Sequence, residues 1–257
     1  MKFNSKNIQL GMNVQLGNNV KIGDNTVIYD NVIIGDNSVI ANNCIIGEPT
    51  TGYYNSNTYS NPETIIGKNC LIRSHTIIYC NNNIGDGLTT GHGTIIREKN
   101  TIGRNCTLGN NVEILPEATI GQYCKIHSKV IICEHAKIGD FVMFYCYVML
   151  ANSPTPPAYI HIAPEIGDYS VIAVHAVLLP GCKIGQNCLV AANSTVTKEF
   201  EDYSVIMGSP AKKVADIRTI PSKEKEGAHY PWMLNYDLGM PWQGIGYKKW
   251  RRKNESR

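Results

Sequence analysis

The chain has 257 residues, a formal net charge of +3 and 18% charged residues, so its composition favours a globular protein and indicates no particular charged partner. No run of about 18 or more apolar residues is present, which excludes a membrane-spanning helix. No signal peptide precedes the first repeat, so we expect a cytoplasmic protein without membrane insertion.

From Ile8 onward the sequence repeats every six residues, beginning IQLGMN, VQLGNN, VKIGDN. The third position of each unit holds Leu, Ile or Val with few exceptions. These third positions run from Leu10 to Ile46, from Ile66 to Leu150 and from Ile166 to Val196, giving 28 units. A short fixed period of this kind indicates a β-solenoid.

Each unit predicts one short strand and one corner. The third residue and the residue two before it point inward, because alternate side chains of a strand share a face. Gly, Asn and Asp at the corners tolerate the left-handed backbone that a tight turn needs. Three units would make one triangular coil, and coils would stack about 4.8 Å apart. We therefore predict an all-β solenoid of about nine coils over residues 1–206.

Nine cysteines are distributed along the repeats. Six of them occupy the small inward position of a unit, so we expect buried core residues rather than disulfides or metal ligands. No CxxC pair is present, which fits a reducing compartment. The six are Cys44, Cys70, Cys106, Cys124, Cys182 and Cys188.

Two insertions interrupt the period, near residues 48–64 and 151–165. Both follow the same wall of the predicted solenoid, so they should leave at one corner and carry function on a rigid scaffold. The outward residues of that wall are apolar except Glu113, which predicts a homotrimer interface. An alternative is that the C-terminal segment covers this stripe. The outward residues are Val27, Ile45, Ile77, Ile95, Glu113, Ile131, Met149 and Val177.

The period ends near Met207, and residues 207–257 are predicted to form a C-terminal docking extension. All three tryptophans, Trp232, Trp242 and Trp250, lie in it. Its last residues include the basic run KKWRRK, which we interpret as solvated. We expect no nucleic-acid binding, because the repeats offer no broad basic face.

Six segments resemble, in order, the acyl-CoA-dependent N-acyltransferases that modify nucleotide-linked amino-deoxy sugars in surface-polysaccharide pathways. They are GEPTTGYYN, TIIYCNNNIGDGLTTGHGTIIRE, IHSKV, ANSPTPP, LLPGCKIGQNCLVAANSTVTK and GSPAK. The repeats and GSPAK are shared by many hexapeptide-repeat acyltransferases, whereas TGHGTIIRE and Asn-x-x-x-Pro-Pro are more selective. The resemblance implies a left-handed β-helix, acetyl-CoA or another acyl-CoA as co-substrate, and direct attack by the amine of a dTDP-linked amino-dideoxy sugar on the thioester. We expect no metal, because six cysteines are core residues and His92, His127 and His135 share no column.

The sequence departs from this family at two places. Asn152-Ser153 stands where the family pattern has Asn-Asp, and Ile131 stands where a second His is usual. The sugar contacts are therefore expected to differ. The identity of the acyl group and the position of the amine, on C3 or C4, stay open.

Three residues are candidates for catalysis. His92 lies in TGHG at a corner, where it projects from the solenoid, and is the first candidate to polarise or deprotonate the amine; the alternative is a corner cap. Glu117 and His135 are 18 residues apart and so should stack one coil apart. A carboxylate beside an imidazole orients it and raises its basicity. The pair is interpreted as an acid–base pair or substrate clamp, or alternatively as a surface ion pair.

Substrate contacts are assigned to Tyr54, Glu98, His127 and Asn152. Tyr54 could stack on a base from the first insertion. Glu98 and Asn152 share a corner column. His127 projects from the same edge of the solenoid as His92, two coils or about 10 Å away.

Coenzyme binding is assigned to two lysines. The resemblance places Lys212 and Lys213 near the phosphates of the coenzyme, and a solvated lysine pair is the alternative reading.

Three competing functions remain. An O-acetyltransferase of a small sugar or xenobiotic would need a base more strictly, because a hydroxyl is a poor nucleophile. A γ-type zinc carbonic anhydrase would need three His around one metal, and His92, His127 and His135 share no column. A non-catalytic scaffold would bind no acyl-CoA.

Overall fold

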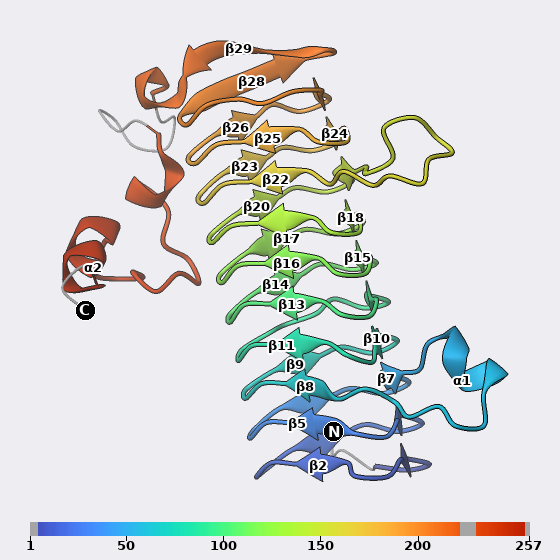
Figure 1. The fold of residues 1–257 in the computed structure, drawn as a ribbon. Helices are drawn as coiled ribbons and strands as arrows, with labels where there is room; N and C mark the ends of the chain where they lie inside the picture. The colour runs from blue at the N-terminus through green and yellow to red at the C-terminus, as the bar shows by residue number, and fades with distance from the viewer. Residues whose placement is uncertain (1–4, 222–229, 255–257) are drawn as a thin grey trace.

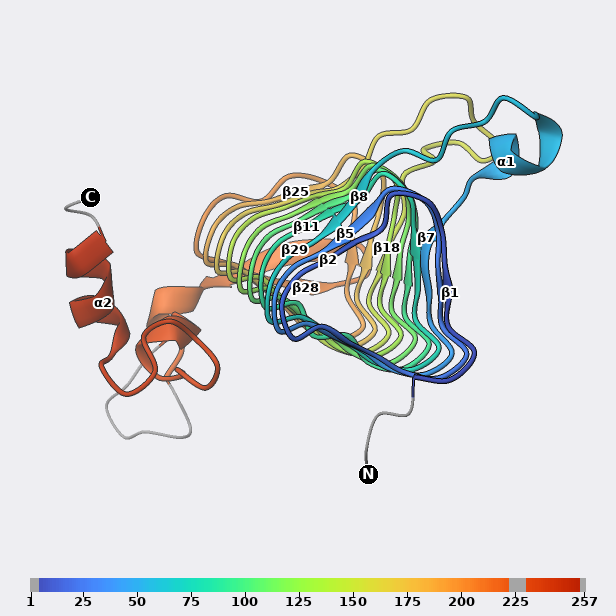
Figure 2. The same cartoon turned by 90° about the horizontal axis from the view of Figure 1, so that it is seen from below.

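The computed structural model describes residues 5–221 and 230–254. Three parallel sheets, here called walls A, B and C, enclose a triangular prism (Figures 1 and 2). Within the coils, strands pair in parallel with the strand one coil away, for example Ile95 with Glu113 and Ile96 with Ile114. The last strand of wall C is the exception, because it pairs antiparallel with the strand before it. The chain therefore passes through all three walls once in each coil.

The strands of wall A are β1 (Gln9–Leu10), β4 (Val27–Ile28), β7 (Ile45–Glu48), β10 (Ile77–Tyr79), β12 (Ile95–Ile96), β15 (Glu113–Ile114), β18 (Ile131–Ile132), β21 (Met149–Leu150), β24 (Val177–Leu178) and β27 (Thr195–Val196). Those of wall B are β2 (Gln15–Leu16), β5 (Val32–Ile34), β8 (Thr64–Ile66), β11 (Asn83–Ile84), β13 (Thr101–Ile102), β16 (Thr119–Ile120), β19 (Lys137–Ile138), β22 (Glu165–Ile166) and β25 (Lys183–Ile184).

Wall C comprises β3 (Lys21–Ile22), β6 (Val39–Ile40), β9 (Leu71–Ile72), β14 (Thr107–Leu108), β17 (Lys125–Ile126), β20 (Met143–Phe144), β23 (Val171–Ile172), β26 (Leu189–Val190), β28 (Ser204–Gly208) and β29 (Ala211–Asp216). Thr89 bridges Leu71 and Thr107, so this wall is continuous.

The solenoid is left-handed. Figure 2 looks along its axis with the N-terminal coils nearest the viewer, and the chain runs counterclockwise from β1 to β2 and from β7 to β8 as it recedes. The left-handed β-helix expected from the resemblance is confirmed. The predicted count of nine coils is too low, because wall A alone has ten rungs. After the last repeat, Phe200 bridges Ile184 and β28 pairs with β26, so the winding continues beyond Val196.

The inward positions of the repeats form the core. The six cysteines expected there are buried, and all nine cysteines are free. Leu10 and Leu16, which have the same inward position, are 52% and 42% exposed. They belong to the first coil, and an end coil has a neighbour on one side only. The repeat pattern therefore predicts a buried residue only where coils stack on both sides.

The corners are stabilised by columns of identical side chains. Asn13 and Asn31 both adopt positive φ, 56° and 60°, and the Asn13 amide donates to Asn31 Oδ1 at 3.1 Å. The Met12 backbone N–H donates to Asp30 Oδ1 at 2.7 Å. These two corners are thus hydrogen-bonded to each other although they are exposed, and Asn and Asp are the residues that such turns favour.

Both insertions leave at one edge, the corner that leads from wall A to wall B, here called the A–B edge (Figures 1 and 2). The first, between β7 and β8, contains the short helix α1 (Thr51–Asn55). The second, between β21 and β22, contains no helix or strand. Five rungs of wall A separate β7 from β21, or about 24 Å.

The C-terminal extension packs on wall C. It follows the hairpin β28–β29 and contains η1 (Ile217–Thr219), η2 (Trp232–Leu234) and α2 (Tyr247–Asn254). Trp232 and Trp242 form an apolar cluster with Met143 and Val171 of wall C and with Phe141 at the corner before β20. The alternative that the extension covers the apolar stripe of wall A is wrong for the described residues, and Met149 in that stripe is 45% exposed. β28 spans residue 206, so the solenoid runs into the extension without a linker.

Within the described ranges, every helix is too short or too polar to traverse a lipid bilayer.

Candidate functional site

A column of three polar side chains, Lys99, Glu117 and His135, lies on the A–B edge. Glu117 Oε2 is 3.2 Å from His135 Nδ1, and Glu117 Oε1 is 2.9 Å from Lys99 Nζ. All three residues occupy corner positions with φ of 62–63°, and they are 18 residues apart, so they stack one above another. The hydrogen bond from Lys99, and then its charge, hold the pKa of the Glu117 carboxyl below its usual value. Sequence analysis missed Lys99, although it lies 18 residues before Glu117.

This contact orients the imidazole of His135. Its Nδ1 faces a carboxylate, so Nε2 is the nitrogen left to act on another group. His135 and Glu117 are 48% and 41% exposed, which leaves the pair accessible to a substrate. The 3.2 Å contact fits two interpretations, an oriented general base and a surface ion pair.

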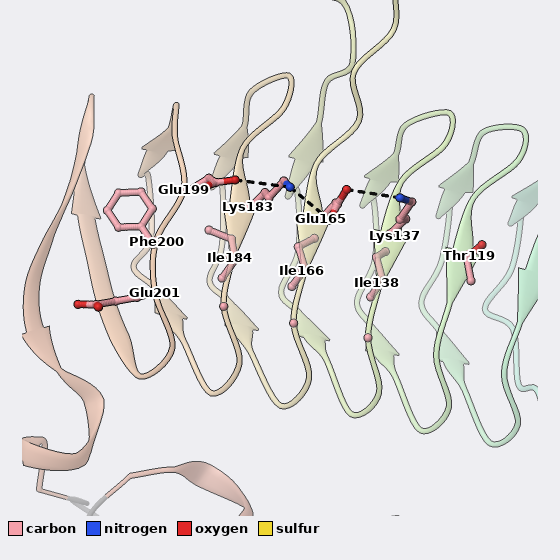
Figure 3. Close-up of a pocket in the computed structure, with 13 residues that line it drawn as sticks. Thr119, Lys137, Ile138, Glu165, Ile166, Lys183, Ile184, Glu199, Phe200 and Glu201 are labelled. Carbon is pink, nitrogen blue, oxygen red and sulfur yellow. Dashed lines mark hydrogen bonds and ion pairs between the residues drawn. The ribbon is translucent and has the colours of Figure 1, made fainter.

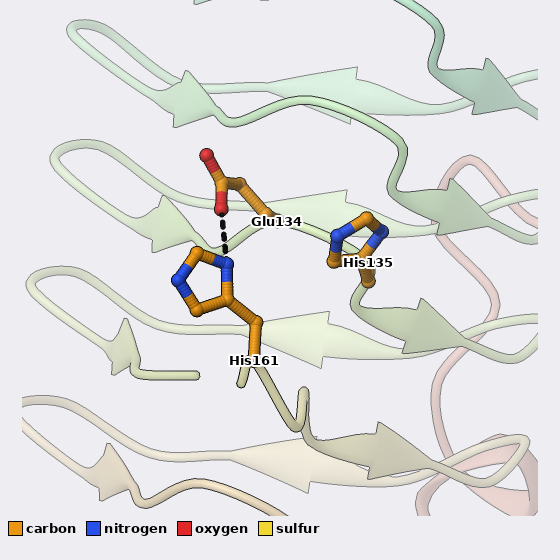
Figure 4. A group of neighbouring side chains, drawn as sticks. All are labelled: Glu134, His135 and His161. Carbon is orange, nitrogen blue, oxygen red and sulfur yellow. Dashed lines mark ion pairs between the residues drawn. The ribbon is translucent and has the colours of Figure 1, made fainter. Parts of the chain in front are cut away.

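A second carboxylate–imidazole pair lies beside the first (Figure 4). Glu134 Oε2 is 3.0 Å from His161 Nδ1, and the Asn152 amide donates to the same oxygen at 3.4 Å. Glu134 and Asn152 are 18 residues apart, so they stack one coil apart and make contact. His161 comes from the second insertion, where no repeat period indicates its position, and sequence analysis did not find it.

Glu98 is held by its own neighbour. Arg97 Nε and Nη2 donate to the two carboxylate oxygens of Glu98 at 2.9 and 3.1 Å. The Arg97 guanidinium also lies 4.8 Å from the centre of the Tyr79 ring. Glu98 is therefore engaged in this structure, and a substrate would have to share or replace Arg97.

Tyr54 lies in α1 and belongs to a group of tyrosines around the first insertion. Its hydroxyl donates to Glu48 Oε1 at 3.2 Å, and its ring meets the ring of Tyr53 edge to face, with 5.1 Å between centroids. Burial raises the pKa of the Glu48 carboxyl. Tyr54 is 67% exposed, so one aromatic face is available for stacking.

His92 lies at the other edge of wall A, the corner that leads from wall C to wall A, here called the C–A edge. It is exposed and flanked by Gly91 and Gly93. A Cβ on Gly91 would lie 2.3 Å from the carbonyl carbon of Gly109, so the corner needs glycine there. Wall A separates His92 from Glu117 and His135. One chain does not bring the three predicted catalytic residues together.

His127 lies on wall C at the same C–A edge. Its ring stacks on Tyr145 with 4.8 Å between centroids, and burial lowers the pKa of its imidazole. It lines a cavity of 500 Å³ between wall C and the extension, together with Lys125, Trp232 and Tyr236. The predicted placement of His127 and His92 at two ends of one ligand stays a prediction.

Lys212 and Lys213 lie in β29 of the C-terminal hairpin and are both exposed. Lys213 Nζ is 2.6 Å from Glu201 Oε1, whereas Lys212 lies beside it on the same strand. Their role in coenzyme binding stays a prediction.

A concave surface of 680 Å³ covers the later coils of wall B (Figure 3). Its charged side chains alternate in sign along the wall, and Lys137 and Lys183 both approach Glu165, at 3.4 and 3.9 Å. Lys183 also pairs with Glu199. This surface carries a row of exposed ion pairs along wall B, and none of the predicted site residues lines it.

Family models match three stretches of the repeat. The bacterial transferase hexapeptide (six repeats) matches residues 13–48 and 163–198, and the hexapeptide repeat of succinyl-transferase matches residues 99–133. These three stretches therefore carry hexapeptide repeats similar to those of bacterial transferases.

Known relatives of the chain are similar over limited stretches. Protein CapG of Staphylococcus aureus is 42% identical over 28% of this chain and 42% of that protein. The 2,3,4,5-tetrahydropyridine-2,6-dicarboxylate N-acetyltransferase of Ligilactobacillus salivarius is 38% identical over 24% of this chain and 26% of that enzyme. The matches thus span less than half the length of these curated relatives. Among solved structures, the Arabidopsis UDP-N-acetylglucosamine acyltransferase has a TM-score of 0.49 at 16% identity, covering 83% of this chain and 73% of that one.

Proposed function

We propose that the protein is an acyl-CoA-dependent N-acetyltransferase whose acceptor is the amino group of a nucleotide-linked amino-deoxy sugar, with a dTDP-linked sugar as the first candidate. The matches to hexapeptide repeats of bacterial transferases support acyl transfer with acetyl-CoA as co-substrate. The TGHGTIIRE and Asn-x-x-x-Pro-Pro segments support the amino-sugar acceptor.

The observation that carries the proposal is the contact of Glu117 with His135 at 3.2 Å, on the edge that also bears both insertions. In the proposed reaction the amine nitrogen attacks the thioester carbonyl carbon, and the C–S bond breaks as coenzyme A leaves as a thiolate. His135 Nε2 accepts the proton from nitrogen and passes it to the thiolate. Glu117 keeps the imidazole oriented and stabilises its charged form.

His92 is the second candidate for the base. It lies across wall A from the Glu117–His135 pair, so the two candidates could act on one substrate only if a neighbouring subunit supplied one of them. The apolar outward stripe of wall A supports a homotrimer in which the A–B edge of one subunit meets the C–A edge of the next.

The test incubates purified protein with acetyl-CoA and a panel of nucleotide-linked amino sugars, with release of the free thiol as the readout. The matched control acceptor is the same nucleotide sugar with a hydroxyl group in place of the amine. Turnover with an amine, with a product one acetyl group heavier, is expected. Turnover with hydroxyl acceptors alone would favour an O-acetyltransferase, and no turnover with any amine would refute the proposal.

Replacing His135 separates the two candidate bases. His135→Asn should lower kcat by about 10²–10⁴-fold, because the amine would lose its proton acceptor. His175→Asn is the matched control, since His175 is an exposed corner residue with φ of 60° that stacks on Tyr147. Full activity in His135→Asn, with loss in His92→Asn, would transfer the role of base to His92.

A further inference from the structure

Two imidazoles and one carboxylate converge at the A–B edge (Figure 4). Each of Glu134, His135 and His161 offers one ligand atom, and these atoms lie within 4.8 Å of one another. The closest pair, Glu134 Oε2 and His161 Nδ1, is separated by 3.0 Å. We propose that Glu134, His135 and His161 form a binding site for a divalent transition metal of the zinc class.

The donor set fits this class of metal. Two His nitrogens and one carboxylate oxygen are a recurrent ligand set for zinc sites that keep an open position, and imidazole favours Zn²⁺, Co²⁺ and Ni²⁺ over Mg²⁺ or Ca²⁺. Tetrahedral ligands about 2.0–2.1 Å from zinc lie roughly 3.3 Å apart. Glu134 Oε2 and His161 Nδ1 are already within that separation, and the other ligand-atom distances, which are at most 4.8 Å, need to shorten by up to about 1.5 Å. His135 and His161 are 48% and 38% exposed, so their side chains are free to make that movement.

Neighbouring residues already orient His135 as a ligand. Glu117 occupies Nδ1 of His135, which leaves Nε2 for the metal, and Lys99 holds Glu117 in place. A carboxylate on the second nitrogen of a metal-binding imidazole fixes the ring and strengthens it as a ligand. In Figure 4 one nitrogen of the His135 ring faces the Glu134–His161 pair. Glu117 is thus a positioning residue in this site.

His161, the third proposed ligand, is anchored although it lies in the second insertion. The backbone N–H of Ile162, next to His161, donates to the Asn152 carbonyl at 2.8 Å, and Gly181 N–H donates to the Ile162 carbonyl at 2.8 Å. Glu134 and His135 belong to the rigid corner after β18. A metal at this site would therefore fasten the second insertion to the solenoid, and it would occupy the nitrogen that the proposed acyl transfer needs as a base.

The expectation of a metal-free protein rests on the separation of His92, His127 and His135, and it did not consider His161. Metal binding at the new site does not depend on the proposed acyl transfer. The effect of the metal on turnover does depend on the proposed acyl transfer, because a bound metal and a proton compete for His135 Nε2.

The test titrates Co²⁺ into untagged, metal-stripped protein and records the visible absorption of the ion, with Zn²⁺ displacement to obtain the dissociation constant of zinc. One ion per chain and an intense tetrahedral spectrum are expected. Glu134→Gln with His161→Ala should abolish the spectrum, and Glu117→Gln should weaken zinc binding by about 10–100-fold. His175→Ala, at a different corner, should bind as the unaltered chain does.

Two outcomes would overturn the proposal: absence of Co²⁺ binding by the folded chain, or binding that Glu134→Gln with His161→Ala leaves unchanged. Circular dichroism checks that the variants are folded, which is expected because the three side chains are partly exposed. If the chain binds metal but acetylates no amine, the proposed function fails and the metal site stands. If the chain acetylates amines but binds no metal, the reverse holds.

Discussion

At the scale of the residue, the buried thiols illustrate how an inward repeat position changes chemistry. Burial raises the pKa of Cys182 to about 12 and that of Cys188 to about 11. The reactive form of a cysteine is its thiolate, so these groups should be inert at neutral pH. Cys146, at a corner, is only half-buried.

Alkylation should therefore distinguish Cys146 from the other cysteines. With iodoacetamide at about pH 8, Cys146 is expected to react first, and the eight buried thiols only after unfolding, as read by mass spectrometry. Rapid labelling of Cys182 in the folded chain would contradict this burial.

The same pKa shifts give a dependence of stability on pH. A thiol whose pKa is higher in the folded state stays protonated while the unfolded chain ionises. Its contribution to the free energy of unfolding is complete below pH 9 and is lost as the pH rises towards about 12 for Cys182. Denaturant titrations over this range should show stability falling with pH.

At the scale of the element, the extension can be studied separately from the coils. All three tryptophans lie in it, so tryptophan fluorescence reports on the extension alone, whereas far-ultraviolet circular dichroism reports mainly on the coils. Coils of a solenoid contact chiefly their neighbours, so the two signals need not change together.

Trp242→Ala should detach the extension. Trp242 is fully buried and its indole N–H donates to the Tyr236 carbonyl at 2.9 Å. Removing a buried aromatic side chain costs about 3–5 kcal/mol. The fluorescence transition should move to lower denaturant while the circular dichroism transition stays in place. Leu238→Ala, at a residue 62% exposed, is the control. A shift of both transitions would mean that the extension stabilises the coils.

The elements also show where sequence-based prediction succeeds. The period assigns each residue a wall and a rung, so the stacking of Glu117 on His135 follows from their separation by one coil. Lys99 obeys the same rule and could have been found. His161 could not, because an insertion has no period and its position depends on backbone contacts such as that of Ile162 with Asn152. The repeat predicts the strands of wall C, but it does not indicate that Trp232 and Trp242 of the extension pack against that wall.

At the scale of the whole molecule, the opposite placement of His92 and His135 makes a prediction about assembly. If a trimer joins the A–B edge of one subunit to the C–A edge of the next, an active site would take residues from two chains. A chain with His92→Asn and a chain with His135→Asn would then complement each other.

Refolding the two inactive chains together in equal amounts should restore about a quarter of the activity. About three trimers in four would contain both chains. In each of these, one of the three subunit junctions would have both His135 and His92. Each variant refolded alone is the control. No recovery would place all catalytic groups within one chain, and a monomer in sedimentation would refute the shared site altogether.

The 18-residue coil also fixes the spacings that are possible between two features on the same edge of the solenoid. The two insertions are separated by five rungs of wall A, and while both stay on one edge their distance along the axis can change only in steps of about 4.8 Å. Adding one whole coil between β12 and β15 would lengthen the molecule by one step and keep both insertions on the same edge. Adding a single six-residue unit there would turn everything beyond it by a third of a revolution, carrying the second insertion to another edge. Variation in the acceptor that such proteins accommodate is therefore expected to come in whole coils or in the insertions themselves, and not in single units.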